Sequence, residues 1–216
     1  HRVHCVLGTQ GGWRGLETPA LECPEWVAEG NMPCYQHGID SIGITGYFSG
    51  CLHGIVGWLA EDYTDEIRGW FDDQDGGIER ALEQVTDGRH FSCSDTIEGM
   101  ADTYAYFVDV ATNRGITVVA YEGGQHITGN GHSVQNDQEF IDFHIAINRA
   151  NGMKQIYEAN FTNWHEMGGT LFVHFVDFGS PSKYGSWGAL EYLGQETSPR
   201  WEAITEFNTQ VPCWWD

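Results

Sequence analysis

Four short apolar runs alternate with helical segments along this chain, and the alternation constrains the fold more than any other feature. Strands that are apolar on both faces are typical of parallel sheets, because helices cover such sheets on either side. Strands and helices in alternation indicate the α/β class. We therefore expect a parallel sheet with strands near residues 3–7, 41–48, 116–121 and 170–176.

A regular amphipathic pattern precedes the third of these strands. Apolar residues recur from Ile97 to Ala111 at the spacing of one helix face. Asp95 and Glu98 fit a capping box at its start, and Gly115 supplies its C-terminal stop. Further helices are predicted over residues 137–150 and 153–164, and one that begins at Ser198-Pro199.

The number of strands bears on the architecture. A chain of 216 residues most simply forms one domain with a real core, so we expect a single domain over residues 1–216. A complete (β/α)₈ barrel takes about 250 residues, and this chain has half of the strands. An open four-stranded sheet is one solution. The other is a half-barrel that another chain or a second copy completes.

The charge balance excludes some classes of partner. The chain carries 31 acidic residues against 10 basic ones, a net charge of -21. Nucleic acid is not an expected partner, because phosphate binding needs the opposite sign. An anionic membrane surface is disfavoured for the same reason. No apolar run approaches the roughly 20 residues that a membrane-spanning helix needs.

The six cysteines favour an oxidising compartment, and so an extracellular location. None of them forms a CxxC pair, which disfavours a zinc knuckle. Cys23 and Cys34 bracket a loop that contains proline and glycine, which suits a disulfide, and Cys51 and Cys93 are candidates for another. Buried free thiols remain the alternative.

One carboxylate ends the third strand. Glu122 follows the apolar run directly, and Gly123 and Gly124 come next, where the lack of a side chain lets a ligand approach closely. Barrel enzymes of the α/β class carry their chemistry at the C-terminal ends of parallel strands. Glu122 is therefore the leading catalytic candidate. The alternative is a strand-terminal ion pair or a helix cap.

The residues that follow the four strands form a coherent set. Aromatic rings stack on the CH faces of sugars, while amide, imidazole and carboxylate groups bind the hydroxyls. This combination predicts an oligo- or polysaccharide as the partner. The candidate substrate-binding residues are Gln10, Trp13, Tyr47, Tyr121, Gln125, His126, His174, Asp177, Tyr184 and Trp187.

The chain also resembles a known family, and the resemblance spans nearly all of it. Residues 118–126 and 171–191 look like the seventh and eighth strands of cellulase-like (β/α)₈-barrel proteins and the loops that follow them. Residues 2–10 and 40–48 look like the fifth and sixth strands of the same group. These proteins are similar to retaining glycoside hydrolases of the large barrel clan. The resemblance implies the C-terminal half of such a barrel and a β-linked glucan as substrate.

In that clan the glutamate that ends the seventh strand is the nucleophile, a role that the resemblance gives to Glu122. The proton donor ends the fourth strand, which would lie before His1 and so is not part of this chain. Retaining hydrolysis needs two carboxyl groups about 5 Å apart. Asp177 and Glu191 are the substitutes within the chain, although neither matches the family position. The acid/base is therefore not identified, and either its residues come from another chain or the activity is weak or absent.

Two further hypotheses belong to other classes. The first is a non-catalytic half-barrel that binds carbohydrate in the same cleft. The second is a metal-dependent enzyme built on the histidines His126, His132, His165 and His174. Their spacing differs from that of the common zinc motifs, so we expect no metal ligands and no cofactor.

Overall fold

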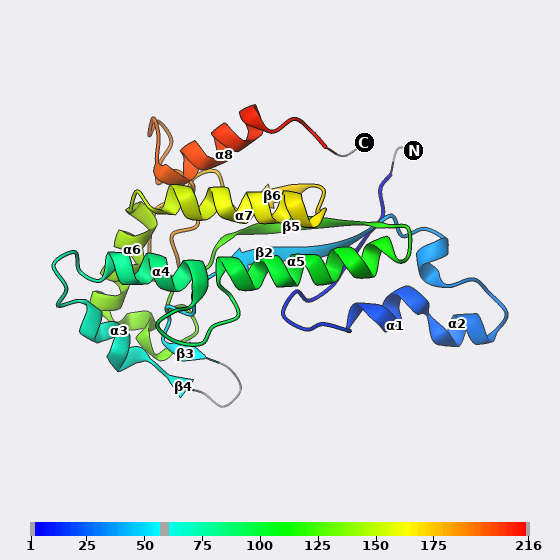
Figure 1. Cartoon of the computed structure of the whole chain (residues 1–216), viewed down its shortest axis with the longest axis horizontal. Helices are drawn as coiled ribbons and strands as arrows, with labels where there is room; N and C mark the ends of the chain where they lie inside the picture. The colour runs from blue at the N-terminus through cyan, green and yellow to red at the C-terminus, as the bar shows by residue number, and fades with distance from the viewer. Residues whose placement is uncertain (1–2, 57–60, 215–216) are drawn as a thin grey trace.

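A computed structural model of the chain describes residues 3–56 and 61–214. At its centre lies a parallel sheet with the strand order β1-β2-β5-β6 (Figure 1). The four strands are β1 (Val6–Gly8), β2 (Ser41–Phe48), β5 (Thr117–Gln125) and β6 (Phe172–His174). The chain is therefore an α/β protein with the parallel sheet that the alternation predicted.

The predicted bounds are right for β2 and differ for the other strands. β1 begins only at Val6, because the carbonyl of Cys5 already accepts hydrogen bonds from the turn at Asp40 and Ser41. β6 is shorter than predicted, because the chain leaves the sheet after His174. The amide of Val176 donates to the carbonyl of Trp187 and not to β5. β5 is longer, because its glycines continue the pairing with β2 as far as Gln125.

Eight helices and a small antiparallel hairpin accompany the sheet in the described part of the chain. The helices are α1 (Glu17–Glu22), α2 (Pro24–Ala28), α3 (Thr64–Trp70), α4 (Ile78–Asp87), α5 (Ile97–Thr112), α6 (Gln138–Arg149), α7 (Met153–Met167) and α8 (Pro199–Gln210). Single 3₁₀ turns span Cys34–Gln36 and Ser133–Asn136, and the hairpin pairs β3 (Ile55–Val56) with β4 (Glu61–Asp62).

The start of α5 corrects one expectation. The N-cap is Thr96, whose hydroxyl accepts the amide of Gly99 at 3.0 Å. The capping box of Asp95 and Glu98 does not form, because Asp95 lies one residue too early to reach the first turn. The carboxylate of Asp95 is therefore left exposed beside the helix.

The core lies between one face of the sheet and the helices α5 and α7 (Figure 1). Ile42 and Ile44 of β2 and Val118 of β5 are buried on this face. Behind them, Tyr104 of α5 meets Trp164 of α7 edge to face, with ring centroids 4.9 Å apart. Successive side chains of a strand point to opposite faces of the sheet, so the residues between these point away from α5 and α7.

The opposite face of the sheet is open. Val6, Tyr121, Val173 and Phe175 are between 40% and 48% exposed on it. Within residues 3–56 and 61–214, no strand pairs with the outer edge of β1 or of β6. The sheet is therefore open at both edges and is not closed into a barrel in the described structure.

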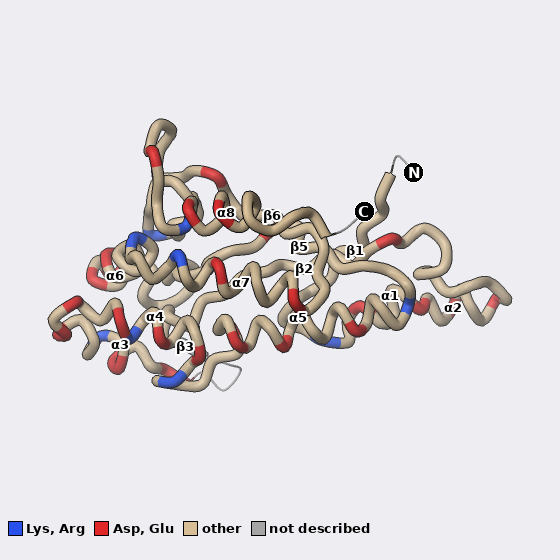
Figure 2. The backbone as a smooth tube through the Cα atoms, turned by 45° about the horizontal axis from the view of Figure 1, so that its top comes forward, with Lys and Arg blue, Asp and Glu red and all other residues tan. Residues whose placement is uncertain are grey.

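Two disulfides close loops of the chain, and both are the pairs that the sequence suggested. Cys23 bonds to Cys34, and Cys51 bonds to Cys93. Cys5 and Cys213 are exposed. Aspartates and glutamates are distributed over most elements (Figure 2). In the part that the structure describes, no helix has the length and apolar character to cross a membrane.

Candidate functional site

Glu122 lies at the C-terminal end of the open face, where β5 contains a bulge. Ala120 pairs with Ile44, yet Glu122 pairs with the next residue, Thr45, so Tyr121 is the extra residue. A bulge bends a strand and redirects its side chains. Here Glu122 comes into register with Thr45, two positions before Tyr47 on the same face of β2. Tyr121 is exposed beside it, over Gly43.

The phenol of Tyr47 lies close to the carboxylate of Glu122. Burial raises the pKa of Tyr47 well above its ordinary value, and the negative charge of Glu122 raises it further. The phenol therefore stays protonated at neutral pH. The Glu122 side chain beside it is half-buried.

Two further rings close around this pair. His126, just after β5, lies with its ring centroid 5.7 Å from that of Tyr47 and 5.0 Å from that of Trp187. Trp187 also lies 6.0 Å from Tyr47. Its indole N–H donates to the carbonyl of Tyr184 at 3.0 Å, which fixes the ring. Tyr47, His126 and Trp187, three of the residues that the sequence proposes for sugar binding, thus form one aromatic cluster.

A cleft of about 670 Å³ adjoins the cluster at the C-terminal end of β2. Trp13, which is 66% exposed, stands on one side of it, in the loop after β1. Gln10 is exposed at the start of the same loop. The cleft is lined by Gly11, Gly12, Trp13, Arg14, Thr45, Tyr47, Phe48, Ser49, His53, Ser94, Asp95, Met100, Thr103 and His126.

Gln125 is buried and its amide is used inside the protein. Its side-chain nitrogen donates to the carbonyl of Ser186 at 2.8 Å, and its oxygen accepts the amide of Ile127 at 2.7 Å. These bonds hold the loop that carries Trp187 against the end of β5. Gln125 therefore positions its neighbours, and its amide is not directed to the open face.

Gly123 and Gly124 permit close packing within the protein. A Cβ at Gly123 would lie 2.5 Å from the ring of Phe172, and one at Gly124 would lie 3.1 Å from the hydroxyl of Tyr157. The space that the sequence suggested for a ligand is filled by these rings. The glycines are needed to seat β5 against them.

His174 and Asp177 lie apart from the Glu122 cluster. Both line a groove of about 550 Å³ between β6 and α8. His174 approaches the hydroxyl of Tyr157 at 3.3 Å, and burial lowers its pKa to about 4. Tyr184 is 54% exposed, and the ammonium of Lys183 lies over its ring. His174 and Asp177 are therefore not gathered with Tyr47 and Trp187, whereas Tyr184 contacts Trp187 through its backbone carbonyl.

The histidines considered for a metal do not come together as a set. His132 stacks on His53 with parallel rings 3.9 Å apart, whereas His165 contacts Trp214 and His174 contacts Tyr157. Among the described residues, no three His, Cys, Asp or Glu side chains are grouped closely enough to hold a metal ion. The metal hypothesis therefore has no site in the described structure.

Neither of the substitute acids joins Glu122. Glu191 forms a two-pronged ion pair with Arg149, at 2.6 and 2.8 Å. This pairing lowers the pKa of Glu191 and keeps it ionised. Asp177 is in the other groove. A different carboxylate, Asp95, lies in the cleft beside Tyr47 and His126, and the sequence had assigned it to a helix cap.

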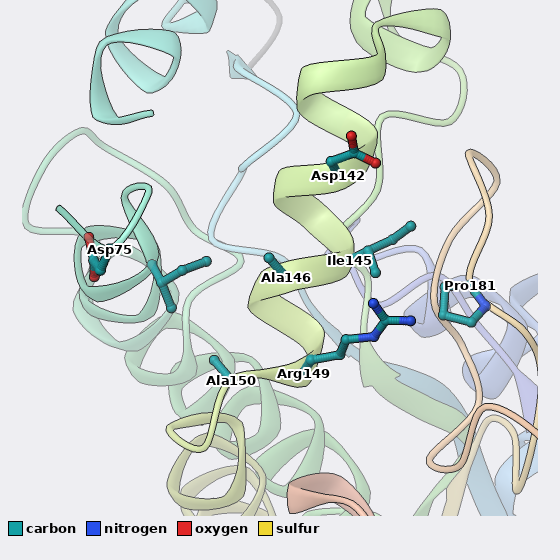
Figure 3. A pocket seen from close by; sticks show the side chains of 8 residues that line it. Asp75, Asp142, Ile145, Ala146, Arg149, Ala150 and Pro181 are labelled. Carbon is teal, nitrogen blue, oxygen red and sulfur yellow. The ribbon is translucent and has the colours of Figure 1, made fainter. Parts of the chain in front are cut away.

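A larger hollow of about 770 Å³ lies between α4 and α6 (Figure 3). Its three charged groups are already engaged. Asp75 accepts the amides of Gly77 and Glu79, Asp142 accepts the amide of Gln138, and Arg149 binds Glu191. The apolar floor and the engaged rim make it a weaker candidate than the cleft that Tyr47 and His126 line.

Comparison with protein-family profiles, with curated proteins and with solved structures finds no significant match to this chain.

Proposed function

We propose that the chain is a glycoside hydrolase-like protein that binds a β-linked glucan at the cleft beside Glu122, with Glu122 as the nucleophile of a retaining mechanism. The observation that carries the proposal is the Glu122 carboxylate close to the phenol of Tyr47, next to a cluster of aromatic side chains. A carboxylate at the end of a parallel strand, with a protonated phenol beside it, is suited to attack an anomeric carbon.

The surroundings of Glu122 suit a sugar better than other ligands. Trp13, Tyr121 and Trp187 offer ring faces for the CH groups of a pyranose. Burial lowers the pKa of His126, so its imidazole is neutral and can exchange hydrogen bonds with hydroxyls. The net charge of -21 disfavours an anionic ligand.

One observation favours a second candidate function, that of a non-catalytic carbohydrate-binding protein. Asp177 and Glu191, the two substitute acids, are both away from Glu122. An unactivated glucan needs a proton on its leaving oxygen. A chain that lacks this donor would hold the sugar without cleaving it.

Two substrates separate these functions. A dinitrophenyl β-cellobioside has a leaving group that needs no proton, so Glu122 alone should release the phenolate, and Glu122→Gln should abolish release. A cello-oligosaccharide should bind to both proteins and be cleaved slowly or not at all. If the wild type and Glu122→Gln both leave the activated substrate intact but still bind the cello-oligosaccharide, the chain is a binding protein. If neither binds the sugar, the proposal is wrong.

The open face supports a proposal about assembly. Both sheet edges are unpaired in the described structure, and all four strands run in parallel. A two-fold axis along the strands would place β1 of one copy beside β6 of the other in parallel orientation. We propose that a second copy completes the barrel in this way. The two disulfides suit secretion, which belongs to the same proposal.

A further inference from the structure

The loop before α5 holds one carboxylate over the cleft. Asp95 is exposed and lines the cleft together with Trp13, Tyr47 and His126. Because Thr96 caps the helix, the carboxylate of Asp95 is not used there. Among the described residues, its oxygens accept one hydrogen bond, from the neighbouring hydroxyl of Ser94 at 3.1 Å. Most of its acceptor capacity therefore points to solvent or to a ligand.

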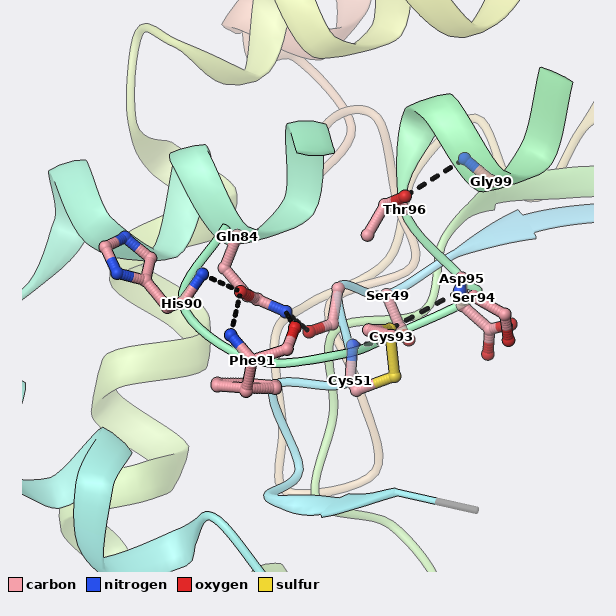
Figure 4. Close-up of a disulfide and its surroundings, with 11 residues drawn as sticks. Ser49, Cys51, Gln84, His90, Phe91, Cys93, Ser94, Asp95, Thr96 and Gly99 are labelled. Carbon is pink, nitrogen blue, oxygen red and sulfur yellow. Dashed lines mark hydrogen bonds between the residues drawn. A yellow bond between two sulfur atoms is a disulfide. The ribbon is translucent and has the colours of Figure 1, made fainter. Parts of the chain in front are cut away.

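The backbone at Asp95 is fixed far more firmly than an ordinary loop. The amides of Ser49 and Gly50 both donate to its carbonyl, at 2.8 and 3.0 Å. The disulfide between Cys51 and Cys93 joins the same two segments (Figure 4). The end of β2 and the residue before α5 are thus tied at neighbouring points.

A buried glutamine anchors the other side of this loop. Gln84 of α4 is fully buried, and its amide accepts the backbone N–H groups of His90 and Phe91 while donating to the carbonyls of Gly50 and Phe91 (Figure 4). These four bonds leave the loop little freedom. Binding residues are often placed on loops that a rigid scaffold positions, and Asp95 has such a support.

We propose that Asp95 is a sugar-binding carboxylate of the cleft, and that the Cys51–Cys93 disulfide is the device that holds it there. This inference rests on the proposed function and adds a residue to it. Glu122 and Asp95 would contact the glucan on either side of Tyr47 and His126. A carboxylate accepts hydrogen bonds from two adjacent hydroxyls of a pyranose, and charged acceptors form stronger bonds than neutral ones.

Calorimetry with cellotetraose tests the proposal on four proteins: wild type, Asp95→Asn, Asp109→Asn and Glu122→Gln. Loss of a charged acceptor should weaken binding by about tenfold or more in Asp95→Asn. Asp109→Asn is the matched control, since Asp109 is an exposed aspartate of α5 that does not line the cleft, and it should bind as the wild type does. Equal affinity of the wild type and Asp95→Asn overturns the inference.

A separate set of variants tests the role of the disulfide. The double variant Cys51→Ser/Cys93→Ser should lose affinity to about the same degree as Asp95→Asn, and the triple variant should lose little more. Additive losses would show that the disulfide acts independently of Asp95 and would overturn this part. A thermal melt identifies any variant that fails to fold, and Asp95→Asn then decides alone. If the wild type does not bind cellotetraose, the proposed function fails first.

Discussion

The phenol of Tyr47 lies close to the carboxylate of Glu122 across two neighbouring parallel strands. The register of β2 and β5 produces this closeness, because the bulge at Tyr121 turns Glu122 onto the face that Tyr47 occupies. A glutamate with a protonated donor beside it is suited to act as an ordered nucleophile. The two residues also connect the open face of the sheet with the aromatic cluster.

Removal of the phenol should therefore reduce the activity at Glu122. We expect the phenol to donate to the carboxylate during the reaction. A hydrogen bond to a charged group contributes about 1.5–3 kcal/mol, so Tyr47→Phe should lower kcat/KM on the activated cellobioside by at least about tenfold. Tyr121→Phe is the matched control, because Tyr121 is exposed next to the same carboxylate. Initial rates of phenolate release measure both. Equal losses in the two variants would contradict a specific role for Tyr47.

Gly123 should not tolerate a side chain. A Cβ there would lie 2.5 Å from the ring of Phe172 and 2.8 Å from the carbonyl of Gly46, so the strand must shift. Gly123→Ala is expected to cost about 1–3 kcal/mol in the free energy of unfolding. Gly8→Ala, where no atom lies within 4 Å of the added carbon, is the control. Urea unfolding of both variants gives the two values, and an unchanged Gly123→Ala would refute the packing argument.

The two disulfides should differ in their contribution to stability. Cys51 and Cys93 are 42 residues apart, whereas Cys23 and Cys34 are 11 apart. Loop-closure entropy predicts a loss of about 4 kcal/mol without the longer link and about 3 kcal/mol without the shorter one. Unfolding in urea of the two double serine variants measures this. A larger loss of stability without Cys23–Cys34 would mean that strain in the folded state, or residual structure in the unfolded state, outweighs loop-closure entropy.

Stability should fall as the solution becomes acidic. His144 is buried with its Nε2 2.9 Å from the carbonyl of Leu52, and burial lowers its pKa from 6.5 to about 4. Below pH 6.5 the imidazole of His144 binds a proton in the unfolded chain but stays neutral in the folded chain. The contribution is therefore intact above that pH and is lost progressively toward pH 4.

For one such imidazole, the loss amounts to about 2 kcal/mol between pH 7 and pH 5. Unfolding in urea at the two pH values should show a smaller drop for His144→Gln than for the wild type. His37→Gln, at an exposed histidine, is the control. If His144→Gln keeps the full pH dependence, other groups are responsible for it.

Assembly through the open face can be tested by the mass in solution. Two copies that each carry a charge of -21 repel one another, and salt screens this repulsion. Light scattering should therefore find a dimer that becomes more populated as salt is raised. A monomer at every salt and protein concentration would refute the proposal that a second copy completes the barrel. A different half-barrel would then be the remaining partner.

Much of the architecture could be predicted from the sequence, because local patterns determine it. The bounds of β2 are right since β5 pairs along its whole length and β1 pairs with its first three residues. The α5 cap was wrong because Asp95 and Thr96 are both good caps, and only the Thr96 hydroxyl reaches Gly99. A sequence without coordinates cannot decide between adjacent candidates of this kind.

The site was predictable in part for a similar reason. Tyr47, His126 and Trp187 follow strand ends, and the ends of parallel strands meet at one edge. Gln125 looked like a ligand contact, but its partner Ser186 lies 61 residues later and only folding reveals it. Asp95 was missed because its place in the cleft depends on the Cys51–Cys93 link and the amides of β2.

The central claim is that the Glu122 carboxylate attacks an anomeric carbon, and a trapped intermediate tests it most directly. A dinitrophenyl 2-deoxy-2-fluoro-β-cellobioside forms the glycosyl-enzyme without a proton donor and slows its hydrolysis. Mass spectrometry of the labelled protein, followed by peptide mapping, locates the added sugar. Our account predicts one sugar per chain on Glu122 and none on the Glu122→Gln variant. A label on another residue, or an unlabelled wild-type chain, would contradict it.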